Sequence, residues 1–258
     1  MATDAPMDVI PLWAILPATL IAMLICTELG HRIGRSRNAR EHEPESTVGG
    51  MVAAELGLLA FLLAITFSLV ANRFDTRREL VLKESNAIGT CYLRAAMLPA
   101  ANGTEARRLL KDYVEIRLQA ARSGDLAASA QKCEQIQVAL WDQATAAASA
   151  DPHSIPIGLF ISSLNDVIDV HAMRLQAVVR ARLPFAVWAI LFSVSALAFL
   201  MMGYHSGLCA RARSPGAFLV TLAFSLVIWL VADMERPHEG LLFISQQPMI
   251  DLRNSMEP

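Results

Sequence analysis

Charged side chains at the ends of two apolar segments are the first residues in this sequence that can do chemistry. Glu28 and Glu55 lie near the ends of long apolar runs, and Asn72, Arg73 and Arg77 follow the second run. Around the axis of an oligomer, carboxylates form a ring that favours cations, whereas arginines at a pore mouth favour anions. These five residues are the predicted ion pathway, and their opposite charges leave its selectivity open.

The same charges also have a structural interpretation. Glu28 and Glu55 can reach the membrane interface or pair with Arg32 or Arg35, and the arginines after the second run can anchor a helix end at the lipid headgroups. We favour this interpretation, although acidic residues in membrane segments are functional candidates by default.

A second group of polar residues interrupts apolar stretches further along the chain. Its members are Asn86, Asn165, Asp166, Asp169 and His171. Asp166 and Asp169 are three positions apart and therefore share one face of a helix. Because buried polar groups need partners, we expect a polar layer that sets the register of a helical bundle, with Arg94 or Arg174 as the counter-charge. An ion or ligand site is the alternative.

Patterns of catalytic or metal-binding residues are missing from the sequence. It has no GxSxG, P-loop, HExxH or GxGxxG pattern, and no histidine has a second histidine three or four positions away. The four cysteines are scattered and form no CxxC, and a net charge of −2 does not suggest binding to nucleic acid. We therefore expect no enzyme activity, no cofactor and no metal.

Four apolar runs are the elements that must position these residues. They span residues 9–29, 51–71, 183–202 and 217–232. A helix needs about 20 apolar residues to cross a bilayer, so each run is a candidate transmembrane helix, with the fourth on the short side. Hydrophobic residues make up 54% of the 258 residues, which is high for a soluble protein. The lipid bilayer is therefore an expected partner.

The segment between the second and third runs is charged and amphipathic. No proline occurs between Asn72 and Leu98, so the second helix is expected to continue out of the membrane as one rod. The sequence predicts an all-α protein with four transmembrane helices and a helical-bundle domain inserted between helices 2 and 3. The expected divisions are residues 1–72, a water-exposed bundle at 73–182, residues 183–233 and a tail at 234–258.

Arginines in the two short loops predict the orientation. These loops carry Arg32, Arg35, Arg37, Arg40, Arg211 and Arg213. Short basic loops stay in the cytoplasm, which places both termini and the helical domain on the extracytoplasmic side of a multi-pass inner-membrane protein. Arginines at both membrane ends of the inserted segment weigh against this orientation.

Three stretches carry a resemblance to a known family. They contain RFDTRR and ESNAIGT within residues 73–90, LNDVIDVH at 164–171, and DMERP with SQQP within residues 233–248. Together they resemble the bacterial "bestrophin-like" integral membrane family, whose function is largely unassigned. The resemblance implies a four-helix membrane protein and an analogy to pentameric anion channels with a pore-lining second helix. It also marks Asp233, Arg236, Pro237 and Gln247 as a tail motif.

Small residues in the second run predict self-association. Ala60, Ala64, Ser68 and Ala71 recur three or four positions apart, a spacing that lets helices approach closely in a membrane. We expect a homo-oligomer with this helix nearest its axis and an ion-channel-like function. The alternative is a non-conducting sensor or scaffold whose bundle binds a ligand or a partner protein.

Overall fold

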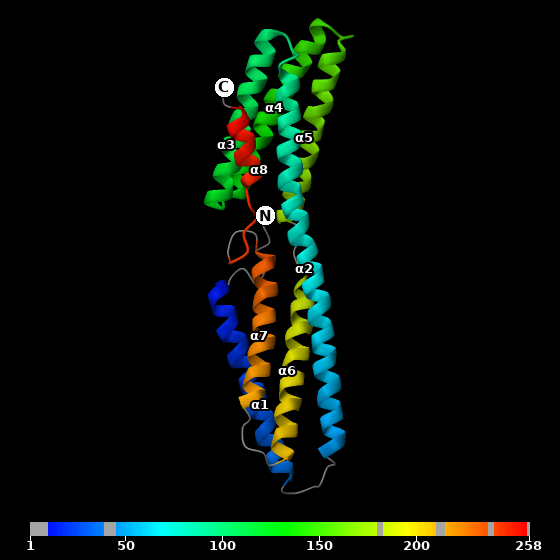
Figure 1. Ribbon diagram of the computed structural model, residues 1–258, viewed down its shortest axis with the longest axis vertical. Helices are drawn as coiled ribbons and strands as arrows, with labels where there is room; N and C mark the ends of the chain where they lie inside the picture. The colour runs from blue at the N-terminus through cyan, green and yellow to red at the C-terminus, as the bar shows by residue number, and fades with distance from the viewer. Residues whose placement is uncertain (1–9, 39–44, 180–182, 210–214, 237–239, 257–258) are drawn as a thin grey trace. The chain divides into compact units, whose positions relative to one another are not determined.

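In a computed structural model, helices are the only regular secondary structure in the described part of the chain (Figure 1). The structure describes residues 10–38, 45–179, 183–209, 215–236 and 240–256. Its helices are α1 (Leu12–Asn38), α2 (Glu45–Ala95), α3 (Ala100–Ser123), α4 (Leu126–Ala150), α5 (Ile155–Val179), α6 (Phe185–Leu208), α7 (Pro215–Glu235) and α8 (Gln247–Met256). The prediction of an all-α chain is confirmed for these residues. The chain divides into unit 1, residues 1–72 with 182–242, and unit 2, residues 73–181 with 243–258.

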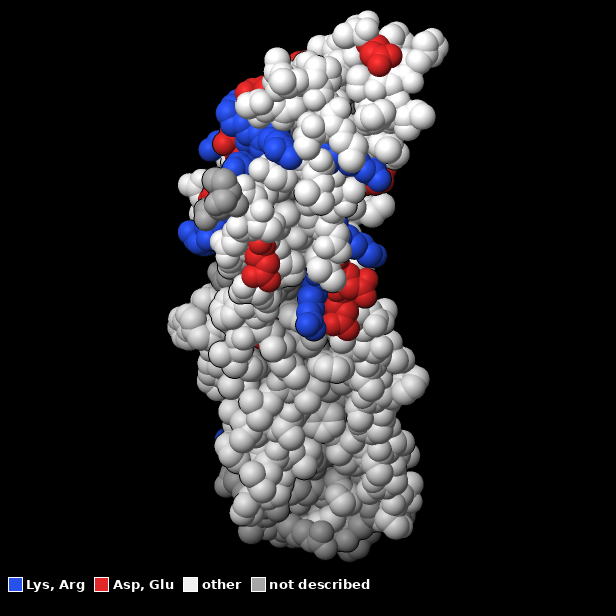
Figure 2. Space-filling model, turned by 45° about the horizontal axis from the view of Figure 1, so that its top comes forward, with Lys and Arg blue, Asp and Glu red and all other residues white. Residues whose placement is uncertain are grey.

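Unit 1 holds the helices that can cross a membrane. Within the described residues, α1, α2, α6 and α7 are long and apolar enough to do so. Their outward faces carry large apolar side chains, including Trp13, Phe61 and Leu219, each more than 60% exposed. Exposed apolar surface on this scale is typical of lipid contact. In the face drawn in Figure 2, charged side chains gather over unit 2, and unit 1 presents almost none.

Helices α1 and α6 of unit 1 approach each other through glycines. A Cβ atom on Gly30 would lie 2.0 Å from the Leu200 carbonyl oxygen, and one on Gly203 would lie 2.0 Å from the Thr27 carbonyl oxygen. Gly34 and Gly207 repeat the arrangement one turn further along. Two small-xxx-small pairs therefore face each other, so backbone packs directly on backbone, the usual way that membrane helices associate closely.

Helix α2 runs without a break through 51 residues. At 1.5 Å per residue it is about 77 Å long, more than twice the hydrocarbon thickness of a bilayer. The expectation of a continuous rod through residue 72 is confirmed, and the helix ends at Ala95, shortly before Pro99.

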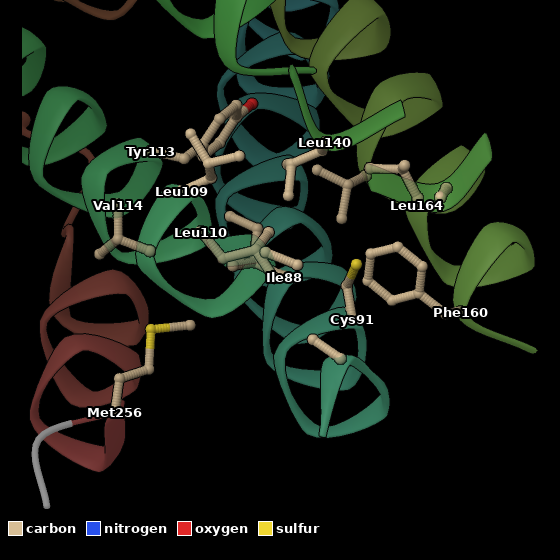
Figure 3. Close-up of a cluster of buried hydrophobic side chains, with 14 of the residues drawn as sticks. Ile88, Cys91, Leu109, Leu110, Tyr113, Val114, Leu140, Phe160, Leu164 and Met256 are labelled. Carbon is tan, nitrogen blue, oxygen red and sulfur yellow. The ribbon is translucent and has the colours of Figure 1, made fainter. Parts of the chain in front are cut away.

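The core of unit 2 draws side chains from five helices. Figure 3 shows Ile88 and Cys91 of α2 meeting residues of α3, α4 and α5, with Met256 of α8 nearby. The most deeply buried large side chains include Leu110, Leu140 and Phe160. The C-terminal helix α8 thus belongs to this core, whereas the apolar residues 241–243 before it are exposed.

Candidate functional site

The five predicted pathway residues differ in how far their side chains are buried. Glu28 is half-buried, and its Oε1 accepts a hydrogen bond from Arg32 Nε at 2.9 Å, which is the pairing considered as a structural alternative. Glu55 is half-buried and Asn72 is exposed, both on α2 in unit 1. In unit 2, Arg73 is half-buried and Arg77 is buried, with 3% of its surface exposed.

The predicted polar layer does not come together inside one chain. His171 is buried, but Asn86, Asn165, Asp166 and Asp169 are exposed. The reason is the rotation of α5 about its axis. Leu164, Val167 and His171 form its buried face, and the two aspartates lie on its exposed face. Neither expected counter-charge forms a hydrogen bond or ion pair with these aspartates, since Arg94 donates to the Leu159 carbonyl and Arg174 to Glu84. That these four exposed residues form contacts between subunits stays a proposal.

A different polar cluster lies in the centre of unit 2, around Glu84 of α2. This carboxylate has no exposed surface. Arg117 of α3 places its Nε 3.2 Å from Oε1 and donates from Nη2 to Oε2 at 3.3 Å, and Arg174 of α5 donates from Nη1 to Oε2. Tyr113 of α3 donates its hydroxyl proton to Oε1 at 2.8 Å. One carboxylate therefore joins three helices.

His171 extends the cluster through Tyr113. Its Nδ1 lies 3.0 Å from the Tyr113 hydroxyl oxygen. Burial and the Glu84 carboxylate hold the pKa of Tyr113 well above its usual value, so the phenol stays protonated. Its single O–H donates a hydrogen bond to Glu84. His171 Nδ1 must then donate to the phenol oxygen, so the neutral imidazole carries its proton on Nδ1. Its Nε2 is a buried acceptor with no hydrogen-bond partner among the described residues.

The charges of this cluster are unequal. Two guanidinium groups share the single buried carboxylate of Glu84, and their side chains are only 9% and 13% exposed. The nearby Cys133 thiol of α4 adds no negative charge, because burial raises its pKa to about 11. The surroundings of His171 are therefore positive. Burial, and then the charge of Arg117, lowers the pKa of His171 below its ordinary value of 6.5.

The sequence contains a signal for this cluster. Leu80, Glu84 and Ile88 are four apart on the inward face of α2, so an acidic residue stands in an apolar stripe. Tyr113 and Arg117 continue the stripe of α3 in the same way. A buried charge needs an opposite charge, but spacing within one helix does not say which other helix provides it.

Asp233 and Arg236 of the tail motif lie, with Glu235, in a second polar cluster within unit 1, at the end of α7. Both Asp233 carboxylate oxygens accept backbone N–H groups, from Leu241 at 2.9 Å and from Leu242 at 3.2 Å. Glu235 Oε1 accepts the backbone N–H of Leu183 at 2.6 Å, just before α6. Arg236 donates to the Ile10 carbonyl, just before α1.

Each charged side chain of this motif thus satisfies backbone groups of a different segment. A carboxylate or guanidinium bond to a backbone group is charge-assisted and stronger than a neutral hydrogen bond. Gly240, with a φ of 128°, lies so close that a Cβ atom there would clash with Asp233 Oδ1. Gln247 is exposed at the start of α8 and donates to Asp251, and Pro237 lies outside the described residues.

Comparisons with known proteins agree on one family and one fold. A family model described as a bestrophin-like domain matches residues 11–249. A bacterial bestrophin homologue from Klebsiella pneumoniae, solved as several variants, is 18% identical in one case, with a TM-score of 0.58 over 94% of this chain and 95% of that one. A second variant is 19% identical with a TM-score of 0.59, over 95% and 96%.

A further solved structure, described only as a membrane protein, is 17% identical. Its TM-score is 0.62, and the match covers 94% of both chains. A search of curated protein sequences gave no match. At these identities the solved structures establish a shared fold, and the family model extends over most of the chain.

Proposed function

Because this chain belongs to the bestrophin-like family of membrane proteins, we propose that it is an oligomeric, ion-channel-like protein whose pathway follows α2. Exposed polar residues on an otherwise apolar membrane helix carry this proposal. Ser68 and Asn72 lie four positions apart on α2, on one face, and both are exposed in a single chain. Polar side chains are costly against lipid, so this face favours a water-filled path or a second subunit. Glu55 and Arg73 of α2 and Glu28 of α1, all half-buried, complete the proposed pathway, and Arg77, which is buried, would support Arg73 from behind.

Self-association rests on the small residues of the same helix. Ala60 and Ala64 line an open apolar groove of about 470 Å³ in unit 1, between α2 and residues of α7 such as Ala223. Because these side chains are small, a neighbouring helix can approach the α2 backbone closely. We keep the homo-oligomer with α2 nearest its axis as part of the proposal.

The water-exposed domain of the proposal is unit 2. Its surface carries the charged side chains seen in Figure 2, and its core is closed by its own helices. The exposed face of α5, with Asn165, Asp166 and Asp169, favours a partner-binding role, which is the observation behind the alternative function of a non-conducting sensor or scaffold. These polar residues would then contact another subunit or a second protein.

We expect the helical domain on the extracytoplasmic side of the inner membrane, because arginine is concentrated at the end of α1 and in the two short connections. A reporter that is active only in the periplasm, fused after Pro258, should then be active, whereas the same reporter fused at Arg37 should be silent. Activity of a cytoplasm-only reporter after Pro258 would show the opposite orientation, with the helical domain in the cytoplasm, and would not bear on the fold.

Single-channel recording of the purified protein in planar bilayers tests the function. We expect an oligomer in mild detergent and discrete conductance steps, and Asn72→Leu should reduce the conductance several-fold because it removes a polar contact from the pathway. Thr66→Val is the matched control: Thr66 lies on α2 but is buried and donates to its own helix at Leu62, so the conductance should not change. A folded oligomer without conductance would favour the sensor or scaffold.

A further inference from the structure

The buried imidazole of His171 is in an environment that fits only its neutral form. Its Nδ1 proton is committed to Tyr113, and its Nε2 has no acceptor within reach among the described residues. Protonation would add an N–H at Nε2 that nothing accepts, and a buried donor without an acceptor is unfavourable. It would also add a positive charge close to Arg117 and Arg174.

Charged and titratable groups face His171 from every helix packed against it. They are Glu84 of α2, Tyr113 and Arg117 of α3, Glu134 of α4, and Arg174 of α5 itself, while Cys133 of α4 lies near Arg117. Glu134 is exposed and its attraction is screened by water, whereas both arginines are largely buried. Glu84 is already shared between the two arginines, so no buried negative charge remains to balance a protonated His171.

We propose that unit 2 contains a proton-sensitive switch, in which protonation of His171 at Nε2 loosens the packing of α5 against α2 and α3. The cluster is suited to this role because Glu84 joins these three helices at one point. A charge added there acts on all three contacts together. When the bundle opens, water reaches Nε2. The water accepts the new N–H and screens the added charge, which the closed cluster cannot do.

The direction of the pH dependence follows from burial and then from Arg117, which together lower the pKa of His171 in the closed bundle. In an opened bundle the imidazole returns to its ordinary pKa, near 6.5. The closed form is therefore fully favoured above pH 6.5. As the pH falls from 6.5 toward the lowered pKa, the opened form binds more protons, and its population rises by up to about tenfold per pH unit.

Hydrogen exchange of the purified full-length protein, followed by mass spectrometry between pH 7.5 and pH 5 and corrected for intrinsic rates, tests the switch. Peptides of α3 and α5 should lose protection as the pH falls below 6.5. His171→Gln should remove this dependence, because glutamine does not titrate. His153→Gln is the matched control: this exposed histidine lies in the turn before α5, and its loss should leave the dependence unchanged.

A second measurement covers the case in which His171→Gln does not fold. Nitrogen-15 spectra of histidine-labelled protein at pH 7.5 should contain one neutral imidazole protonated at Nδ1, with a titration midpoint below 6.5. A His171 that is charged at pH 6.5, or exchange that ignores pH, would overturn the switch.

The consequence for ion flow rests on the proposed channel function, but these two readouts do not. If the protein conducts, acid should change the conductance of the native protein and leave that of His171→Gln unaffected. Absence of conductance with pH-dependent exchange intact would remove the channel and keep the switch. Conductance together with pH-independent hydrogen exchange would remove the switch and keep the channel.

Discussion

Replacing Glu84 with glutamine should lower the free energy of unfolding of unit 2 by about 3–5 kcal/mol, because it leaves two buried arginines without their counter-charge. Glutamine keeps the size of the side chain, so the loss reports on charge rather than on a cavity. The carboxylate has no exposed surface and bonds to Tyr113, Arg117 and Arg174, so no solvent screens the effect. The measurement is denaturant unfolding of the purified protein, followed by protease resistance of unit 2.

Glu105→Gln provides the control for this variant. Glu105 of α3 also pairs with an arginine, Arg108, at 2.6 Å, but both side chains are exposed. Exposed pairs contribute little to stability, so this variant should unfold like the native protein. Equal effects of the two substitutions would mean that the Glu84 cluster does not hold the helices together. A double variant, Glu84→Gln with Arg174→Met, should recover part of the loss, because it removes one of the two uncompensated charges.

The second large effect is expected at the contact between α1 and α6. A single methyl group, in Gly203→Ala, should destabilise unit 1 by about 3 kcal/mol, at the upper end of the cost of overpacking. The reason is the obstacle: the new Cβ would lie 2.0 Å from the Thr27 carbonyl oxygen and 2.8 Å from its carbon. Because these are backbone atoms, no side chain can rotate away, and the two helices must separate.

Gly57→Ala in α2 is the matched control for that variant. Gly57 is also a glycine within a membrane helix, but a Cβ atom there would meet no other atom within 4 Å. Alanine at this position should be neutral or slightly stabilising, since it is the better helix former. The midpoint of thermal unfolding in detergent, read by size-exclusion chromatography, compares the two. Native-like unfolding of Gly203→Ala would show that α1 and α6 do not pack through their glycines.

Features set by local composition could be predicted from the sequence. Within the described residues, the four helices that are long and apolar enough to cross a membrane follow from the length of the apolar runs. The continuous α2 follows from the absence of proline between Asn72 and Leu98. The family followed from the three stretches that resemble it, and the family model matches residues 11–249.

Only the tertiary structure decided which side chains meet. Helical spacing could not place Asp166 and Asp169, whose exposure depends on the rotation of α5 about its axis. Glu84, which is not among the predicted site residues, joins three helices. The tail motif was recognised as a pattern, but its bonds to Ile10 and Leu183 reach across 226 and 52 positions.

The glycine contact between α1 and α6 shows the same limit. Gly30 and Gly203 matter because they lie at the same contact between α1 and α6, and the sequence of neither segment indicates that it packs against the other. Periodicity describes one helix at a time, because it arises from the repeat of the backbone. Partners are chosen by packing and charge balance between helices distant in sequence, and these act only once the chain has folded.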